Sequence, residues 1–135
     1  MVIAGAPSYL KRCGEPQTTS DLEQHNRLGF GYVRAIDGWP LKKNNQTVVV
    51  PTAGRVHASD GEALRQLAPG GNGLARLAVY TVRDDIAAGR LIPVLEDFNP
   101  GDRETFHAIH LGQGGPLPSR VRALLDFLAE RGRVE

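Results

Sequence analysis

The segment from Ser59 to Glu62 carries the residue types that begin a helix and that could bind a small anion. A Ser followed three residues later by a Glu is a capping box, in which each side chain accepts a hydrogen bond from the backbone N–H group of the other residue. The first turn of a helix also presents unpaired N–H groups and a partial positive charge, which suit a carboxylate ligand. Capping alone would also account for both residues. Asp60 lies in the same turn and would oppose an anion, so the charge of a ligand stays open.

Other reactive residue types occur without the neighbours that catalysis or metal binding needs. His107 and His110 are three residues apart, and in a strand such residues face opposite sides, so they could not share one metal ion. Cys13 follows Lys11 and Arg12, whose charges could make the thiol reactive, but no His or Asn is placed by sequence to pair with it. We therefore expect no metal site, no cofactor and no catalytic group, and we interpret Cys13 as an isolated thiol.

Two further patterns are interpreted as structural. The motif Gly71-x-Gly73 follows an expected helix and precedes an expected strand, which is the reverse of the order found in phosphate-binding loops. It therefore predicts a helix stop. The acid pairs at 84–85 and 96–97 are typical of exposed, solvated turns.

Short strands and helices must position these residues. We expect strands at 1–6, 28–34, 39–43, 46–50, 55–58, 74–77, 91–95 and 105–111, and helices at 9–13, 20–24, 59–68, 81–88 and 118–131. Ser8 is expected to open the first helix and Gly14 to end it, while Ser20 and Glu23 have the spacing of a second capping box. Asn44-Asn45 tolerates positive φ and predicts a hairpin. The last helix has an apolar stripe, formed by Val121, Leu124, Leu125 and Leu128. Alternating strands and helices predict an α/β class with a mixed sheet.

Composition limits the function classes. The chain has 135 residues, 41% of them hydrophobic, which fits one domain with a modest core. The formal net charge of +1 gives no electrostatic reason to expect nucleic-acid binding. A single cysteine suits a reducing compartment, and no apolar run approaches the roughly 20 residues of a membrane span. We expect a soluble, cytoplasmic protein.

Five separated segments resemble, in the same order, the effector-binding domain of LysR-type transcriptional regulators. They are APSYL at 6–10, SDLEQH at 20–25, RVHASDGEAL at 55–64 with GNGLA at 71–75, DIAAGRLIPVL at 85–95, and the helix at 118–128. Asn72 departs from the family, which usually has an apolar residue between the two glycines, and Pro69 shortens the preceding helix.

The resemblance implies the periplasmic-binding-protein-like (type 2) α/β architecture, in which a ligand binds between two lobes. Residues 1–95 would form lobe two, and 96–135 would hold C-terminal elements that return toward lobe one. The remainder of lobe one and a DNA-binding winged helix-turn-helix are expected to be absent, which leaves a truncated two-lobed effector domain.

The family's function implies effector sensing that controls DNA binding of the intact protein. The residues expected to contact a small-molecule effector, of which a carboxylate is one candidate, are His57, Ala58, Ser59, Asp60, Gly61 and Trp39. A lone Trp such as Trp39 is more often a core or hairpin anchor than a pocket residue, and it lies near Tyr32 and Arg34 in the sequence. Self-association to a dimer or tetramer is expected, with the last helix packing on another chain or on lobe two, and DNA would be bound only through the absent N-terminal domain. The alternatives are a protein-interaction or oligomerisation module and, less favoured, a small enzyme.

Overall fold

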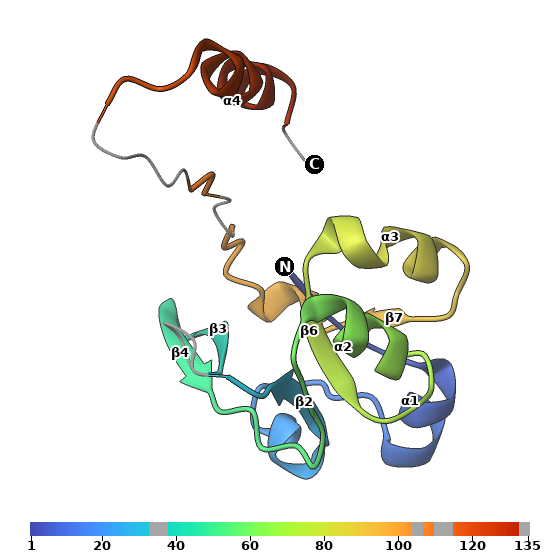
Figure 1. Ribbon diagram of the computed structural model, residues 1–135. Helices are drawn as coiled ribbons and strands as arrows, with labels where there is room; N and C mark the ends of the chain where they lie inside the picture. Colours follow the sequence, from blue (N-terminus) through green and yellow to red (C-terminus); the bar gives the residue numbers. More distant parts are fainter. Residues whose placement is uncertain (33–37, 104–106, 110–114, 133–135) are drawn as a thin grey trace. The chain divides into compact units, whose positions relative to one another are not determined.

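The computed structural model describes residues 1–32, 38–103, 107–109 and 115–132, which belong to two compact units, 1–103 and 104–135 (Figure 1). Residues 96–103, which the sequence analysis places with the C-terminal elements, lie in the compact unit 1–103. Phe98 packs against the core of that unit, and the Asn99 side chain donates a hydrogen bond to the carbonyl oxygen of Met1 at 2.6 Å. The assignment of the two parts to lobes of an effector domain stays a prediction.

Unit 1 is built on a five-stranded mixed sheet, which confirms the predicted α/β class. Across the sheet the order is β5 (His57–Ala58), β2 (Arg27–Phe30), β6 (Leu74–Leu77), β1 (Val2–Gly5) and β7 (Ile92–Val94). Strand β2 is parallel to β5 and β6, whereas β1 is antiparallel to β6 and β7. The carboxyl ends of β5, β2, β6 and β7 therefore lie at one edge of the sheet, where β1 begins.

The two faces of the sheet bury two hydrophobic clusters, because successive residues of a strand point to opposite faces. Val2 and Ala4 of β1 belong to the cluster covered by α2 (Gly61–Leu67) and α3 (Val79–Ala87). Ile3, between them, belongs to the other cluster. That second face is covered by α1 (Pro7–Cys13), the 3-10 helices η1 (Asp21–Gln24) and η2 (Glu96–Phe98), and the hairpin of β3 (Trp39–Lys43) and β4 (Gln46–Val50). Val82 and Ile86 of α3 both pack into the first cluster, as their spacing predicted.

The hairpin agrees with the sequence prediction residue for residue. Its two strands pair antiparallel from Trp39 with Val50 to Lys43 with Gln46. Asn44 and Asn45 take the positive φ values (50° and 65°) that a two-residue loop needs to match the twist of the strands.

Local capping differs from the sequence prediction at both predicted capping boxes in unit 1. At η1, Ser20 makes no side-chain cap; instead the Asp21 carboxylate accepts hydrogen bonds from the N–H groups of Gln17 (2.9 Å) and Thr18 (2.8 Å). Helix α1 begins at Pro7 and not after Ser8, because the fixed φ of proline suits the first helical position. Its predicted end is confirmed: Gly14 has φ 84° and donates its N–H group to the carbonyl oxygen of Leu10 at 2.8 Å.

Several predicted strands are shorter in the structure. The expected strand 55–58 is reduced to β5, and 91–95 to β7. The expected strand 28–34 ends at Phe30, and its last two residues lie outside the described residues. Of the expected strand 105–111, only 107–109 are described, and they are not strand; His110 lies outside the described residues.

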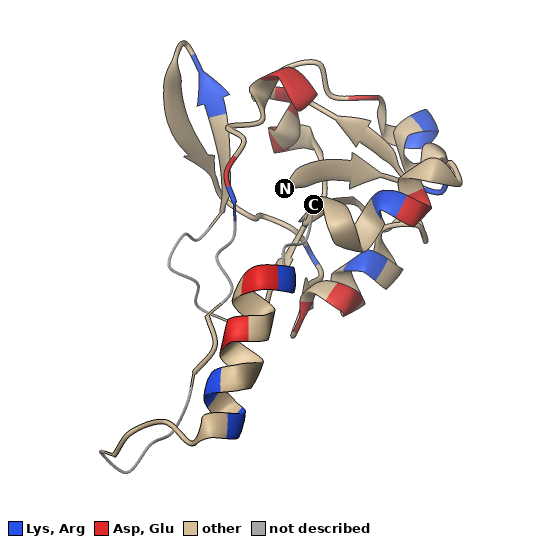
Figure 2. Ribbon diagram, turned by 90° about the horizontal axis from the view of Figure 1, so that it is seen from above, with Lys and Arg blue, Asp and Glu red and all other residues tan. Residues whose placement is uncertain are grey.

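In unit 2, the helix α4 (Ser119–Arg131) confirms the predicted C-terminal helix, with Pro118 before its first turn. Val121 and Leu125 are half-buried, whereas Leu124, Phe127 and Leu128 are exposed. Figure 2 shows basic residues toward the start of α4, acidic residues along its second half and the basic Arg131 in its last turn. Within the described parts of the chain, no helix is long and apolar enough to cross a membrane.

Candidate functional site

The strongest candidate site lies at the edge of the sheet where the parallel strands end. We call this the carboxyl edge, and it consists of residues 31–32 after β2, 59–60 after β5, 78–79 after β6 and 95–96 after β7, with Met1 beside them. In open α/β sheets, ligands bind in the crevice outside the carboxyl ends of the strands. The topology thus brings the predicted turn at Ser59 to the edge where a ligand would be expected.

The start of α2 is capped by Asp60 and not by Ser59, which corrects the predicted capping box. The Asp60 carboxylate accepts the N–H group of Ala63 at 2.8 Å, and the Ser59 hydroxyl donates to the other carboxylate oxygen at 3.0 Å. The backbone N–H of Ala63, followed by the Ser59 hydroxyl, lowers the pKa of Asp60, so this turn carries a negative charge. Glu62 does not return to the cap, because Arg65 and Gln66 bind its carboxylate, and the hydrogen bond from Arg65 lowers its pKa to about 2.

The predicted contact residues at this turn differ in exposure. His57, Ser59 and Asp60 are exposed, Gly61 is half-buried, and Ala58 is buried in the first core cluster. Of these residues, only Ser59–Gly61 form a continuous stretch at the surface. Their contact with an effector stays a prediction.

Trp39, the sixth predicted contact residue, is 4% exposed and belongs to the core cluster beneath the hairpin. A Cβ on the preceding Gly38 would lie 2.6 Å from the carbonyl oxygen of Val50, so the backbone is closely packed there. Trp39 therefore anchors the hairpin in this structure, and its contact with a ligand stays a prediction.

Tyr32, by contrast, is 52% exposed at the carboxyl edge, with its ring centroid 5.3 Å from that of Phe30. Arg34 lies outside the described residues.

The start of α3 forms the part of the carboxyl edge that follows β6. Its charge differs from that at the start of α2. The residue before its first turn is Ala78, which has no side chain that can cap, and the first turn holds no acidic residue. The Thr81 hydroxyl donates back to the carbonyl oxygen of Ala78 at 2.7 Å. The positive end of the helix dipole is therefore not offset by a carboxylate at α3, as it is at α2.

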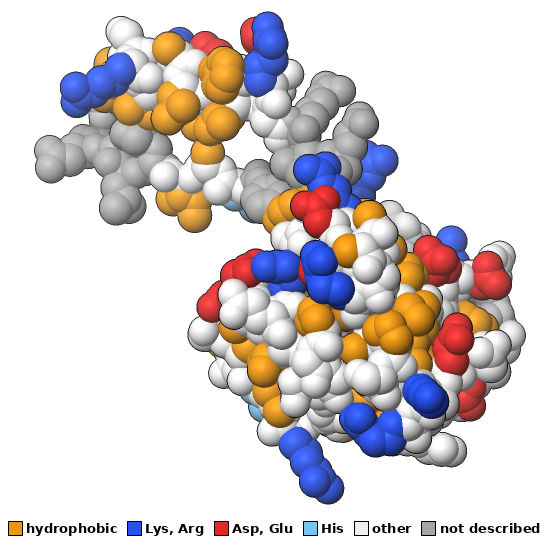
Figure 3. All heavy atoms as spheres, turned by 90° about the vertical axis from the view of Figure 1, so that its right-hand side faces the viewer, with side chains coloured by type: hydrophobic (Ala, Val, Ile, Leu, Met, Phe, Trp, Pro, Cys, Tyr) orange, Lys and Arg blue, Asp and Glu red, His pale blue; other side chains and the backbone are white. Residues whose placement is uncertain are grey.

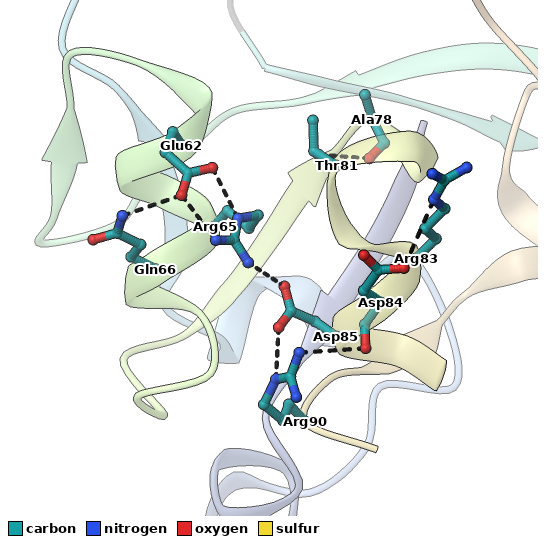
Figure 4. A network of polar contacts seen from close by, with 9 residues as sticks. All are labelled: Glu62, Arg65, Gln66, Ala78, Thr81, Arg83, Asp84, Asp85 and Arg90. Carbon is teal, nitrogen blue, oxygen red and sulfur yellow. Dashed lines mark hydrogen bonds and ion pairs between the residues drawn. The ribbon is translucent and has the colours of Figure 1, made fainter. Parts of the chain in front are cut away.

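A buried carboxylate ties α2 to α3 beneath this edge. Asp85 is 3% exposed, and it accepts Nη1 of Arg65 at 2.6 Å and Nε of Arg90 at 2.7 Å (Figure 4). These bonds, first that from Arg90, hold the pKa of Asp85 below its usual value. The sequence interpretation of 84–85 as solvated is correct for Asp84, whose side chain is 90% exposed, and wrong for Asp85. The missed signal is its spacing, since residue 85 shares a helix face with Val82 and Ile86.

Asn26 fixes the glycine turn and the loop before β5. Its carbonyl oxygen accepts the N–H group of Leu74 at 2.9 Å, and its side chain bonds the backbone of Asn72 and of Arg55. Gly71 has φ 73° and donates to Ala68 at 3.0 Å, which confirms the interpretation of this motif as a helix stop.

The remaining candidates for binding or reactivity are a metal site, a cavity and the thiol of Cys13. Within the ranges that the structure describes, no three His, Cys, Asp or Glu side chains gather to hold a metal ion. A cavity beside Arg76 and Glu96 measures only about 10 Å³, the lower limit for one water molecule, and could not hold an effector. Cys13 is an exposed free thiol at the end of α1.

Comparison with known proteins gives consistent matches over nearly the whole chain. Residues 1–133 match the family described as LysR substrate binding domain. The HTH-type transcriptional regulator CrgA of Neisseria meningitidis serogroup B is 33% identical over 130 residues, which cover 95% of this chain and 42% of that protein. The probable HTH-type transcriptional regulator LtrA of Klebsiella pneumoniae is 30% identical, covering 96% and 42%.

Solved structures agree with these matches. The regulatory domain of CrgA from Neisseria meningitidis, a LysR-type transcriptional regulator, superposes with a TM-score of 0.82 at 32% identity and covers 96% of this chain and 63% of that one. The full-length virulence activator AphB of Vibrio cholerae superposes with a TM-score of 0.63 at 26% identity, covering 72% and 33%. These likenesses confirm the predicted periplasmic-binding-protein-like architecture. The chain spans about two fifths of the length of the curated relatives it matches.

Proposed function

Because the chain belongs to the LysR substrate-binding domain family, we propose that it is the effector-sensing part of a transcriptional regulator and provides one wall of a small-molecule cleft at its carboxyl edge. The relatives are transcriptional regulators, which argues against the alternative of a small enzyme. The observation that carries the proposal is the convergence of β2, β5 and β6 on this edge, because their ends bring Tyr32, Ser59 and Ala78 together.

We infer from the charges at this edge how an effector would lie. The Asp60 carboxylate makes the start of α2 negative, so a carboxylate effector would be repelled there. The start of α3 has no such charge. An anionic group is therefore better placed toward Ala78, and a cationic or hydrogen-bond-donating group toward Ser59 and Asp60.

The variant Ser59→Ala tests contact at this turn without disturbing the helix cap, because the bond from Ala63 to Asp60 remains. The chain would be titrated with benzoate, succinate and glutamate, and the melting temperature followed, since a ligand that binds only the folded state raises it. We expect at least one of these compounds to raise the melting temperature of the natural chain and to bind Ser59→Ala more weakly. The control is Ser20→Ala, an exposed serine that makes no side-chain cap. Equal affinity for Ser59→Ala and the natural chain would refute contact at this turn.

Asp60→Asn tests the charge argument, because asparagine also caps helices well but carries no charge. Benzoate should bind Asp60→Asn several-fold more tightly than the natural chain, through loss of repulsion. Unchanged benzoate affinity would show that the ligand does not approach this carboxylate. Hydrogen-exchange protection by benzoate at 58–60 and 78–81 would support the carboxyl edge, and protection confined to another face would refute it.

A second candidate function, self-association, is favoured by α4. Leu124, Phe127 and Leu128 are 57%, 58% and 46% exposed on one helix, and large exposed apolar patches mark interaction surfaces. Figure 3 shows apolar side chains gathered over this helix. Sedimentation equilibrium would test it: we expect a dimer or tetramer that Leu124→Glu dissociates, whereas a monomer at all concentrations would refute it. The matched relatives are HTH-type transcriptional regulators, and we propose that DNA binding in such a regulator lies outside the substrate-binding domain.

A further inference from the structure

The segment that follows β7 is held against the sheet by contacts with Arg76 of β6 and with the backbone of Met1. Asp102 forms an ion pair with Arg76 of β6, and the Asn99 side chain donates to the carbonyl oxygen of Met1 at 2.6 Å. Between them Gly101 has φ 72° and donates its N–H group to the Asn99 side chain at 3.1 Å, which shapes the turn that carries Asp102 back to the sheet. Both contacts hold residues 95–103 beside the point where β1 begins.

Arg76 is an unusual residue for its position, because its side chain is only 8% exposed. It points to the same face as Leu74, and Ile3, Val94 and Leu95 line the small cavity beside it. Arginine is almost never buried without a partner, since a buried charge is costly unless it is paired. Glu96 lines the same cavity but is exposed, and Asp102 is the carboxylate that pairs with Arg76.

The chain turns at Leu95 in a conformation that leucine rarely adopts. Its φ of 56° and ψ of 35° lie in the left-handed region, where a side chain crowds the backbone. Leu95 is 8% exposed within the second core cluster, so packing holds it in this conformation. Such strained residues persist only where their surroundings determine them, and they concentrate at switch regions.

We propose that the Arg76–Asp102 ion pair and the Asn99–Met1 hydrogen bond form a latch that closes over the strained turn at Leu95. Closed, the latch fixes the point at which the chain leaves unit 1. Open, it lets Leu95 relax to extended backbone, and residues 96–103 separate from the sheet. The latch uses contacts within unit 1 and needs no effector, so its failure would leave the proposed function untouched.

Hydrogen exchange on the full chain tests the latch, because it reports local opening segment by segment. In Asp102→Asn we expect the amides of 95–103 to exchange about tenfold faster, the change that follows loss of one charge-assisted hydrogen bond. Asn99→Ala should accelerate the same segment, and the two changes together should act more strongly than either alone. The amides of β1 and β6 should keep their protection.

The matched control is Glu96→Gln, which removes a carboxylate from the same segment and the same cavity without touching the ion pair. Arg76→Gln combined with Asp102→Asn removes the pair without leaving a lone buried charge, so it guards against simple misfolding. This double variant should also open 95–103 selectively. Equal exchange in Asp102→Asn and Glu96→Gln, or acceleration spread evenly over β1, β6 and β7, would overturn the latch.

Discussion

Replacing Asp85 by asparagine should destabilise unit 1 more than the same replacement of Asp84, the other acid of α3. The carboxylate is 3% exposed and accepts charge-assisted bonds from Arg65 and Arg90 at 2.6 and 2.7 Å. Each such bond contributes about 1.5–3 kcal/mol. The two arginine side chains are 30% and 54% exposed, so their charges can be resolvated, and asparagine keeps one acceptor oxygen. We therefore expect a loss of about 2 kcal/mol, less than the roughly 3–5 kcal/mol lost when a fully buried ion pair is broken.

The assay is thermal and urea unfolding of the natural chain, Asp85→Asn and the matched control Asp84→Asn. For a unit of about 100 residues, 2 kcal/mol corresponds to roughly 10 °C in melting temperature. Asp84 is the neighbouring residue with a 90% exposed side chain and a 3.7 Å contact to Arg83, so its replacement should shift the melting temperature by no more than about 2 °C. Equal shifts for the two variants would refute the reasoning that burial and pairing distinguish these acids.

The pH dependence gives an independent check on the same carboxylate. The pKa of Asp85 is lowered in the folded chain, chiefly by Arg90, so its contribution is complete above its unfolded pKa of about 3.8 and is lost as pH falls through the folded value. The stability difference between the natural chain and Asp85→Asn should therefore be constant from pH 7 to about pH 5 and shrink below about pH 4. A difference that stays constant down to pH 2 would contradict an ionised, paired carboxylate.

Two further changes have defined outcomes. Burial lowers the pKa of His25, so unfolding should become easier as pH falls below its unfolded value of about 6.5, and His25→Gln should flatten that part of the pH profile. Gly73 has φ 158° and an added Cβ would press into the carbonyl oxygen of Asn26, so Gly73→Ala should lower the free energy of unfolding by at least about 2 kcal/mol. Gly61→Ala, where a Cβ meets open space in the first turn of α2, should leave stability unchanged or raise it by about 0.5 kcal/mol in the same urea titrations.

Patterns that depend on near neighbours could be predicted from the sequence. The hairpin 39–50, strand β6 and helix α4 lie where alternation, turn residues and apolar spacing placed them. Strand ends were predicted less well: several strands are shorter than predicted, because the apolar alternation in the sequence continues past the point where hydrogen-bonded pairing stops. Strand β5 keeps only two residues, since Asn26 draws the backbone of Arg55 into a side-chain bond and away from the sheet.

The turn at 59–62 shows how two local signals compete. Both Ser59 and Asp60 can cap a helix, and the position of Glu62 favours a capping box that starts at Ser59. In the structure Arg65 binds Glu62 on the same helix, which removes the partner that the capping box needs. Asp60 then caps the helix, so the negative charge that the sequence placed in the first turn belongs to the capping residue itself.

The neighbouring acids Asp84 and Asp85 show what the sequence could have predicted and what it could not. The spacing of Val82, Asp85 and Ile86 places the second acid on the inward face of α3, so its burial was open to prediction. Its partners were not, because Arg65 lies 20 residues away and meets Asp85 only when α2 packs beside α3. This pairing joins the two helices whose first turns form neighbouring parts of the carboxyl edge. A change in the charge of Asp85 would therefore break the ion pair that joins both parts of the proposed effector wall.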